Sequence, residues 1–117
     1  MRKLLIGGVL SQIVVSQSAL ALDVTGSWVA KWPNGAQNEI SLRSDNGRLS
    51  GICVNDARDQ CTVSGNFVET NRHIVLTIKC PRWDIRLQGT VSADGRTASG
   101  TFQAYVAASG QFTMEKQ

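Results

Sequence analysis

The sequence predicts an all-β protein: an up-and-down antiparallel meander of about eight short strands closed into a small barrel. After residue 22, apolar and polar residues alternate in short runs, and no stretch has a helical period. Gly, Asn, Asp and Pro separate these runs, and both Asn46-Gly47 and Asp94-Gly95 suit a two-residue type I′ hairpin turn. The links are short, so consecutive strands should pair. The expected strands span roughly 25–32, 37–44, 48–54, 61–69, 73–80, 83–92, 96–106 and 110–116.

The strand register can be predicted as well, because a slip of one residue turns every side chain to the other face. Hairpins are centred on Asn46-Gly47, Thr70-Asn71 and Asp94-Gly95. In each hairpin the apolar set of one strand then meets that of its neighbour. The expected facing pairs are Leu42 with Gly51, Ile40 with Cys53, Phe67 with Ile74, Val63 with Ile78, Cys61 with Cys80, Val91 with Ala98, Gly89 with Gly100 and Leu87 with Phe102.

Eight strands with one apolar face must hide that face. A closed barrel does so and removes exposed strand edges, and a two-sheet sandwich is the alternative. Glycines recur on the inward face near mid-strand, where they permit sharp bends in a small barrel or leave space for a ligand. These glycines are Gly51, Gly65, Gly89 and Gly100. The short strands and the large inward side chains favour a filled interior over a hollow one.

The N-terminus is typical of a cleaved signal peptide. Arg2 and Lys3 precede an apolar run, and the small residues Ala19 and Ala21 fit a cleavage site after residue 21. The run is too short to span a bilayer. Residues 22–117 then form one domain, in which 10 of the 12 basic residues remain against 9 acidic ones. We expect a periplasmic or secreted protein, with no nucleic-acid partner and no membrane insertion after cleavage.

An oxidising compartment allows the cysteines to pair. The register places Cys53, Cys61 and Cys80 on three consecutive strands, on the inward face and near the same barrel end. Cys61 is the middle one and can pair with either neighbour. Cys53–Cys61 is favoured because its loop is shorter, and Cys61–Cys80 is the alternative. The third thiol is expected to be buried and inert, with an intermolecular bridge and a catalytic thiol as the other readings.

No constellation of residues predicts an enzyme, a metal or a cofactor. The only histidine, His73, should lie on the outward face, far from the cysteines, so neither a Cys-His pair nor a Cys3His zinc site is expected. The acidic side chains fall mostly in turns or on the outward face, and no inward pair offers general acid–base chemistry. No serine lies in a G-x-S-x-G elbow.

The aromatic residues indicate a binding rim instead. Trp32 and Trp83 should both lie near strand ends at one mouth of the barrel, where tryptophan can stack on a ligand or plug the core. The turns around 33–36, 55–60 and 81–83 would form this rim. The candidate rim residues are Trp32, Asn55, Asp56, Arg58, Asp59, Arg82 and Trp83.

The stretch "TGSW", which contains Gly26 and Trp28, opens the first strand, and Lys116 lies near the end of the last one. This arrangement resembles the Gly-x-Trp start of calycin barrels, the lipocalin, fatty-acid-binding and avidin-like proteins. The resemblance implies that Trp28 packs at a closed barrel end beneath the basic Lys116. It also implies a binding or inhibitory role; the biotin ring of avidin-like proteins has no match here.

Two functions follow as expectations. The first is a non-enzymatic binding module for a small apolar ligand or an envelope component. The second is a protein inhibitor or interaction partner of a secreted or envelope enzyme, which would present the loop "NDARDQ" between Cys53 and Cys61. The sequence identifies neither the ligand nor the oligomeric state.

Overall fold

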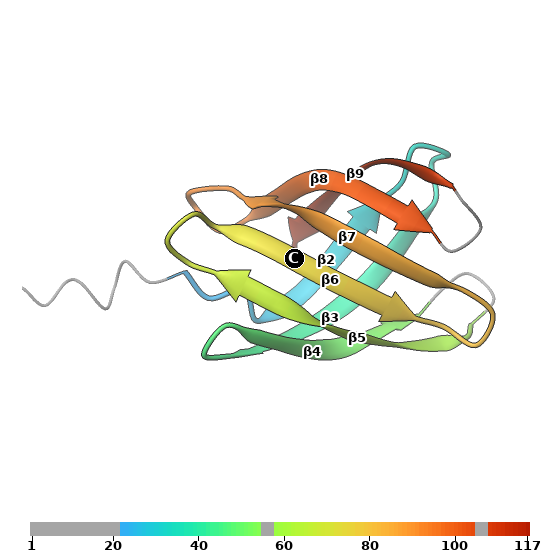
Figure 1. The fold of residues 1–117 in the computed structure, drawn as a ribbon, viewed down its shortest axis with the longest axis horizontal. Coiled ribbons are helices and arrows are strands. Elements are labelled where there is room, and N and C mark those ends of the chain that lie inside the picture. Colours follow the sequence, from blue (N-terminus) through green and yellow to red (C-terminus); the bar gives the residue numbers. More distant parts are fainter. Residues whose placement is uncertain (1–21, 55–57, 105–107) are drawn as a thin grey trace, which may run out of the picture.

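The computed structural model describes residues 22–54, 58–104 and 108–117, so the predicted leader 1–21 lies outside the described residues. The described chain forms eight antiparallel strands joined as a meander and closed into a barrel, as the sequence predicts (Figure 1). The strands are β2 (Gly26–Lys31), β3 (Gln37–Asp45), β4 (Arg48–Val54), β5 (Gln60–Val68), β6 (His73–Lys79), β7 (Asp84–Val91), β8 (Thr97–Ala104) and β9 (Ser109–Lys116).

The register matches the prediction in every hairpin that was centred from the sequence. Leu42 faces Gly51, Phe67 faces Ile74 and Val91 faces Ala98, and the other predicted ladder pairs follow from the same registers. The barrel closes where the first strand, β2, pairs with the last, β9. This closing pair excludes the sandwich alternative.

One predicted turn differs from the expectation. Asn46 and Gly47 both have positive φ, 52° and 85°, as a type I′ turn requires. At the other site Gly95 has positive φ, but Asp94 does not, and the loop is closed by Ser92 N donating to Thr97 O at 2.8 Å. The Asp94 carboxylate accepts hydrogen bonds from Ser92 Oγ and from the backbone N of Arg96, and these bonds stabilise the wider turn.

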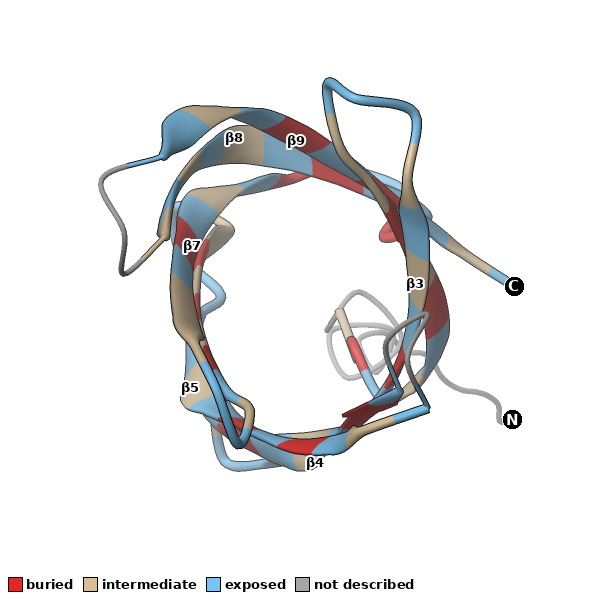
Figure 2. Cartoon of the chain, turned by 90° about the vertical axis from the view of Figure 1, so that its right-hand side faces the viewer, coloured by how far each residue is buried: buried red, intermediate tan, exposed pale blue. Residues whose placement is uncertain are grey.

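The inward side chains fill the barrel as one apolar cluster. Viewed along the barrel, the more buried residues alternate with exposed or half-buried ones along the strands (Figure 2). Trp28, Ile40 and Phe112 are among the largest of the fully buried side chains. Leu22, Trp32, Ile85 and Phe102 pack partly buried against this cluster. The filled interior that the sequence favours is therefore the one observed.

One end of the barrel is closed by the segment that precedes β2. The Trp28 indole donates its Nε1–H to the carbonyl oxygen of Val24 at 2.9 Å, and both residues have 0% exposure. The Lys116 ammonium donates to the carbonyl oxygen of Asp23 at 2.9 Å. A Cβ on Gly26 would lie 2.9 Å from Lys116 Cε, so glycine leaves room for the lysine side chain. Gly26, Trp28 and Lys116 thus lie together at this end of the barrel.

Candidate functional site

The opposite end of the barrel carries the predicted rim. It is formed by the turns that follow β2 and β6 and by the neighbouring strand ends, on the right in Figure 1. Trp32 and Trp83 both line one hollow of about 360 Å³ at this mouth, which we call the rim hollow. Its walls include Trp32, Pro33, Asn38, Trp83, Ile85 and Phe102. The two tryptophans, about 50 residues apart in the sequence, are therefore brought to one site.

The Trp32 side chain is held in place from two sides. Its Nε1–H donates to Asn38 Oδ1 at 2.6 Å, and its ring meets the Phe102 ring edge-on with 5.2 Å between centroids. The Asn38 amide nitrogen donates to the carbonyl oxygen of Val54 at 3.5 Å. Because these polar groups have partners, the surface offered to the hollow is mainly the apolar faces of the rings.

Trp83 is positioned by the turn between β6 and β7. The backbone N of Cys80 donates to the carbonyl oxygen of Trp83 at 2.9 Å, which closes the turn over residues 80–83. Cys80 is in turn bonded to Cys61 on the neighbouring strand β5. The disulfide thus anchors the base of the turn that presents Trp83 to the hollow.

The remaining predicted rim residues contribute less to the hollow. Arg58 is exposed, with a φ of 66°, Asp59 is half-buried and Arg82 is exposed; none of the three lines the hollow. Asn55 and Asp56 lie outside the described residues. Sequence reasoning did not include Asn38, Ile85 and Phe102 in the rim. The alternation of the strands places the side chains of all three on the inward face near a strand end, and this pattern could have predicted them.

The favoured disulfide pairing is wrong, and the alternative is the one observed: Cys61 bonds Cys80, and Cys53 is free and buried. In antiparallel sheets, pairs without mutual hydrogen bonds have Cα atoms about 4.5 Å apart, against about 5.5 Å for hydrogen-bonded pairs. The Cα atoms of Cys61 and Cys80 are 4.4 Å apart, and the backbone N of Cys80 donates to Trp83 rather than across to Cys61. Cys61 therefore directs its own backbone hydrogen bonds to Cys53, its partner on β4, at the wider spacing. The strands already align Cys61 with both Cys53 and Cys80, so the length of the intervening loop does not determine which disulfide forms.

The free thiol of Cys53 should be unreactive in the folded protein. Burial raises the pKa of this thiol from 9.0 to about 11, so the reactive thiolate is scarce at neutral pH. We expect no thiol to react with a disulfide reagent at pH 8 without denaturant, and one thiol per chain to react in urea. Because the raised pKa favours the protonated form only in the folded state, stability is expected to fall as the pH rises from about 9 to about 11.

Cys53→Ala is the control for this prediction, since it should remove both the urea-exposed thiol and that part of the pH dependence. One rapidly reacting thiol in the native wild-type protein would contradict the buried position of Cys53. Three reacting thiols in urea would contradict the disulfide.

Two carboxylates with lowered pKa values lie in turns. The pKa of Asp94 is lowered, chiefly by the hydrogen bond from the Ser92 hydroxyl, and that of Asp23 by the backbone N–H of Thr25. Both carboxylates therefore have structural roles in turns. Within the described ranges, no group of three His, Cys, Asp or Glu residues is placed to hold a metal ion. The same ranges contain no helix long and apolar enough to cross a membrane.

Fold and site together define the chain as a small meander barrel, closed at one end by Trp28 and bearing an aromatic hollow at the other. No family model, curated protein or solved structure matches the chain. The resemblance to calycins therefore rests on the arrangement of Gly26, Trp28 and Lys116 alone and stays a prediction.

Proposed function

We propose that this chain is an exported, non-enzymatic binding module that holds a small apolar ligand, or the apolar part of an envelope component, in the rim hollow. The observation that carries the proposal is the convergence of Trp32, Trp83 and Phe102 on one hollow of about 360 Å³. This volume lies near the lower end of the range for small-molecule sites, about 300–1,000 Å³, and apolar walls with few polar groups are typical of them.

The other features of the chain agree with this role. A filled core supports the hollow from below, so the binding residues stand on a rigid scaffold rather than on a deep cavity. The Cys61–Cys80 disulfide is compatible with an oxidising compartment, and the signal-like residues 1–21 support export. The alternative role of an enzyme inhibitor depends on the loop 55–60, which is only partly described, and stays a prediction.

Trp83→Ala is expected to weaken the binding of N-phenyl-1-naphthylamine, a neutral apolar fluorescent probe, about tenfold, because buried aromatic anchors dominate such sites. Fluorescence titration of the folded variant measures the effect. Trp83 is preferred to Trp32 for this test because the latter also bonds Asn38 within the scaffold.

Val68→Ala is the matched control. Val68 is a large apolar residue, 46% exposed, at the opposite end of β5, so its removal should change the affinity less than twofold. If both variants bind the probe as the wild type does, or if the wild type does not bind it, the rim hollow is not a site for apolar ligands.

A further inference from the structure

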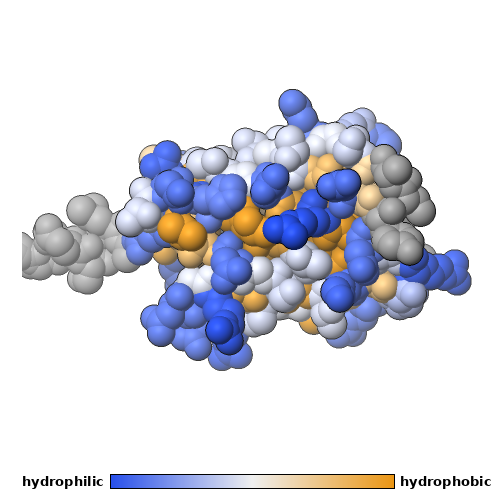
Figure 3. All heavy atoms as spheres, viewed as in Figure 1, coloured by the Kyte–Doolittle hydropathy of each residue, from blue (hydrophilic) through white to orange (hydrophobic). Residues whose placement is uncertain are grey.

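The outer face of the barrel carries a second feature, a groove across β3 to β7 that the rim does not explain. We call it the arginine groove. It is lined by Arg43, Arg48 and Arg86 together with Ser50, Ser64 and Thr77, and its volume is about 1020 Å³. Hydrophilic side chains project over this side of the molecule, with less polar surface visible between them (Figure 3).

The strand register shows how the groove is built. Arg43 faces Ser50, which faces Ser64, and Ser64 faces Thr77, which faces Arg86. One outward row therefore carries three short hydroxyl side chains between two long cationic ones. The short side chains form the floor, and the arginines form the two walls.

The arginines have no partners within the described part of the chain. Among those residues the ion pair present is Lys31 with Glu115, and Arg43, Arg48 and Arg86 make no hydrogen bond or ion pair with any of them. Arg48 lies opposite Asp45 at the hairpin, yet the two form no ion pair. Three guanidinium groups at one groove with a single carboxylate nearby favour an anionic ligand, since guanidinium groups form paired hydrogen bonds to carboxylates.

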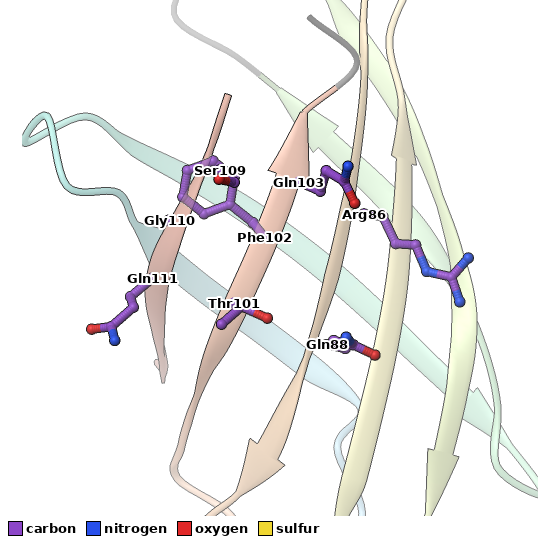
Figure 4. Close-up of a pocket in the computed structure, with 8 residues that line it drawn as sticks. All are labelled: Arg86, Gln88, Thr101, Phe102, Gln103, Ser109, Gly110 and Gln111. Atoms are coloured by element: carbon purple, nitrogen blue, oxygen red, sulfur yellow. The ribbon is translucent and has the colours of Figure 1, made fainter. Parts of the chain in front are cut away.

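The groove continues beyond Arg86 onto the last strands. Gln88, Gln103 and Gln111 lie on neighbouring strands, and Arg86 reaches from β7 over β6, away from Gln103 (Figure 4). Amide and hydroxyl groups both donate and accept hydrogen bonds, which is what the hydroxyl groups of sugars require. The backbones that carry Arg43 and Arg86 are four strand spacings apart, about 19 Å along the sheet. A ligand that follows this band must therefore be extended.

From this arrangement we infer that the arginine groove and its continuation over β7 to β9 bind an acidic polysaccharide. Its carboxylates would lie on the arginines, and its hydroxyl groups on the Ser and Thr side chains of the groove and the Gln side chains of the continuation. A nucleic acid fits less well. Single-stranded nucleic acid is held by successive aromatic stacking platforms. The arginine groove itself has no aromatic lining residue, and among the described residues its continuation over β7 to β9 is lined by Phe102 alone of the aromatics. Nucleic-acid-binding domains are also strongly basic, whereas residues 22–117 carry 10 basic and 9 acidic residues.

Polygalacturonate, a carboxylate polysaccharide, is the probe that tests the inference, with neutral dextran as its uncharged counterpart. We expect the wild type to bind polygalacturonate with an affinity that falls as NaCl is raised, because salt screens the charges, and to leave dextran unbound. Arg86→Gln should weaken binding at least fivefold, and Ser64→Glu, which places a carboxylate on the groove floor, at least tenfold. Calorimetric titration measures the affinity.

Two matched variants separate the groove from overall charge. Arg96→Gln removes a cation from the loop between β7 and β8, and Ser27→Glu adds an anion on β2; both positions are exposed and outside the groove, so each should change the affinity less than twofold. Equal losses in groove and control variants would overturn the inference, as would no binding of polygalacturonate. Tighter binding of a single-stranded oligonucleotide would overturn the assignment to a polysaccharide.

Discussion

Gly51→Ala is expected to lower the free energy of unfolding by about 3 kcal/mol, the upper part of the usual range for an overpacked core. A Cβ on Gly51 would collide with the carbonyl oxygen of Ser41 and lie 2.9 Å from its carbonyl carbon. Ser41 belongs to β3, which is hydrogen-bonded to β2 on one side and β4 on the other. Its backbone therefore cannot retreat without breaking ladder hydrogen bonds. Urea denaturation followed by circular dichroism measures the loss.

Ser50→Ala is the control for this change, since it adds no atom and alters an exposed, outward side chain next to Gly51 on the same strand. We expect it to shift the free energy of unfolding by less than about 0.5 kcal/mol. If Gly51→Ala is as mild as the control, the close approach of β3 and β4 is not required by the fold.

The same argument settles the purpose of the inward glycines. A Cβ on Gly65 would meet the carbonyl oxygen of Val75, and one on Gly89 that of Ser99. In each case the obstacle is the backbone of the neighbouring strand rather than empty space. These glycines therefore allow adjacent strands to bend and coil closely in a small barrel.

Most of this fold could be predicted from the sequence because its contacts are local. Each hairpin joins strands that follow one another, so one turn such as Asn46-Gly47 determines a whole register. The closing pair of β2 and β9 needs no separate signal, because these two strands have the only edges left unpaired once every other described strand pairs with its neighbours in sequence. The wider turn at Asp94 was missed because its shape depends on side-chain hydrogen bonds from Ser92 rather than on the Asp-Gly dipeptide.

The candidate sites were less predictable for a different reason. The positions of Trp32 and Trp83 near strand ends predicted that they share one mouth of the barrel. The role of Phe102 depends on its ring contact with Trp32, which the alternation of apolar and polar residues cannot predict. The arginine groove was missed because Arg43 and Arg86 each read as ordinary outward residues. Only the row that joins five strands brings them to the same groove.

The double change Cys61→Ala and Cys80→Ala is expected to lower the free energy of unfolding by about 3 kcal/mol, the value for a closed loop of this size. The bonded residues are 19 positions apart, and the bond joins β5 to the end of β6 where the turn to Trp83 begins. Urea denaturation of the variant and of the wild type, with and without reductant, measures the loss. Both cysteines are changed because a lone Cys61 would still face Cys53 across β4 and β5.

The disulfide should also affect binding, because it anchors the turn that carries Trp83. We expect the double variant, while still folded, to bind N-phenyl-1-naphthylamine more weakly than the wild type and polygalacturonate equally well, since the arginine groove contains neither cysteine. Cys53→Ala is the control, because it removes a buried sulfur and leaves the bond intact. A double variant that loses stability but keeps full affinity for the probe would show that the bond supports the barrel and not the position of Trp83. Equal weakening toward both probes would instead indicate that the barrel had loosened as a whole, since the rim hollow and the groove both include residues of β3 and β7.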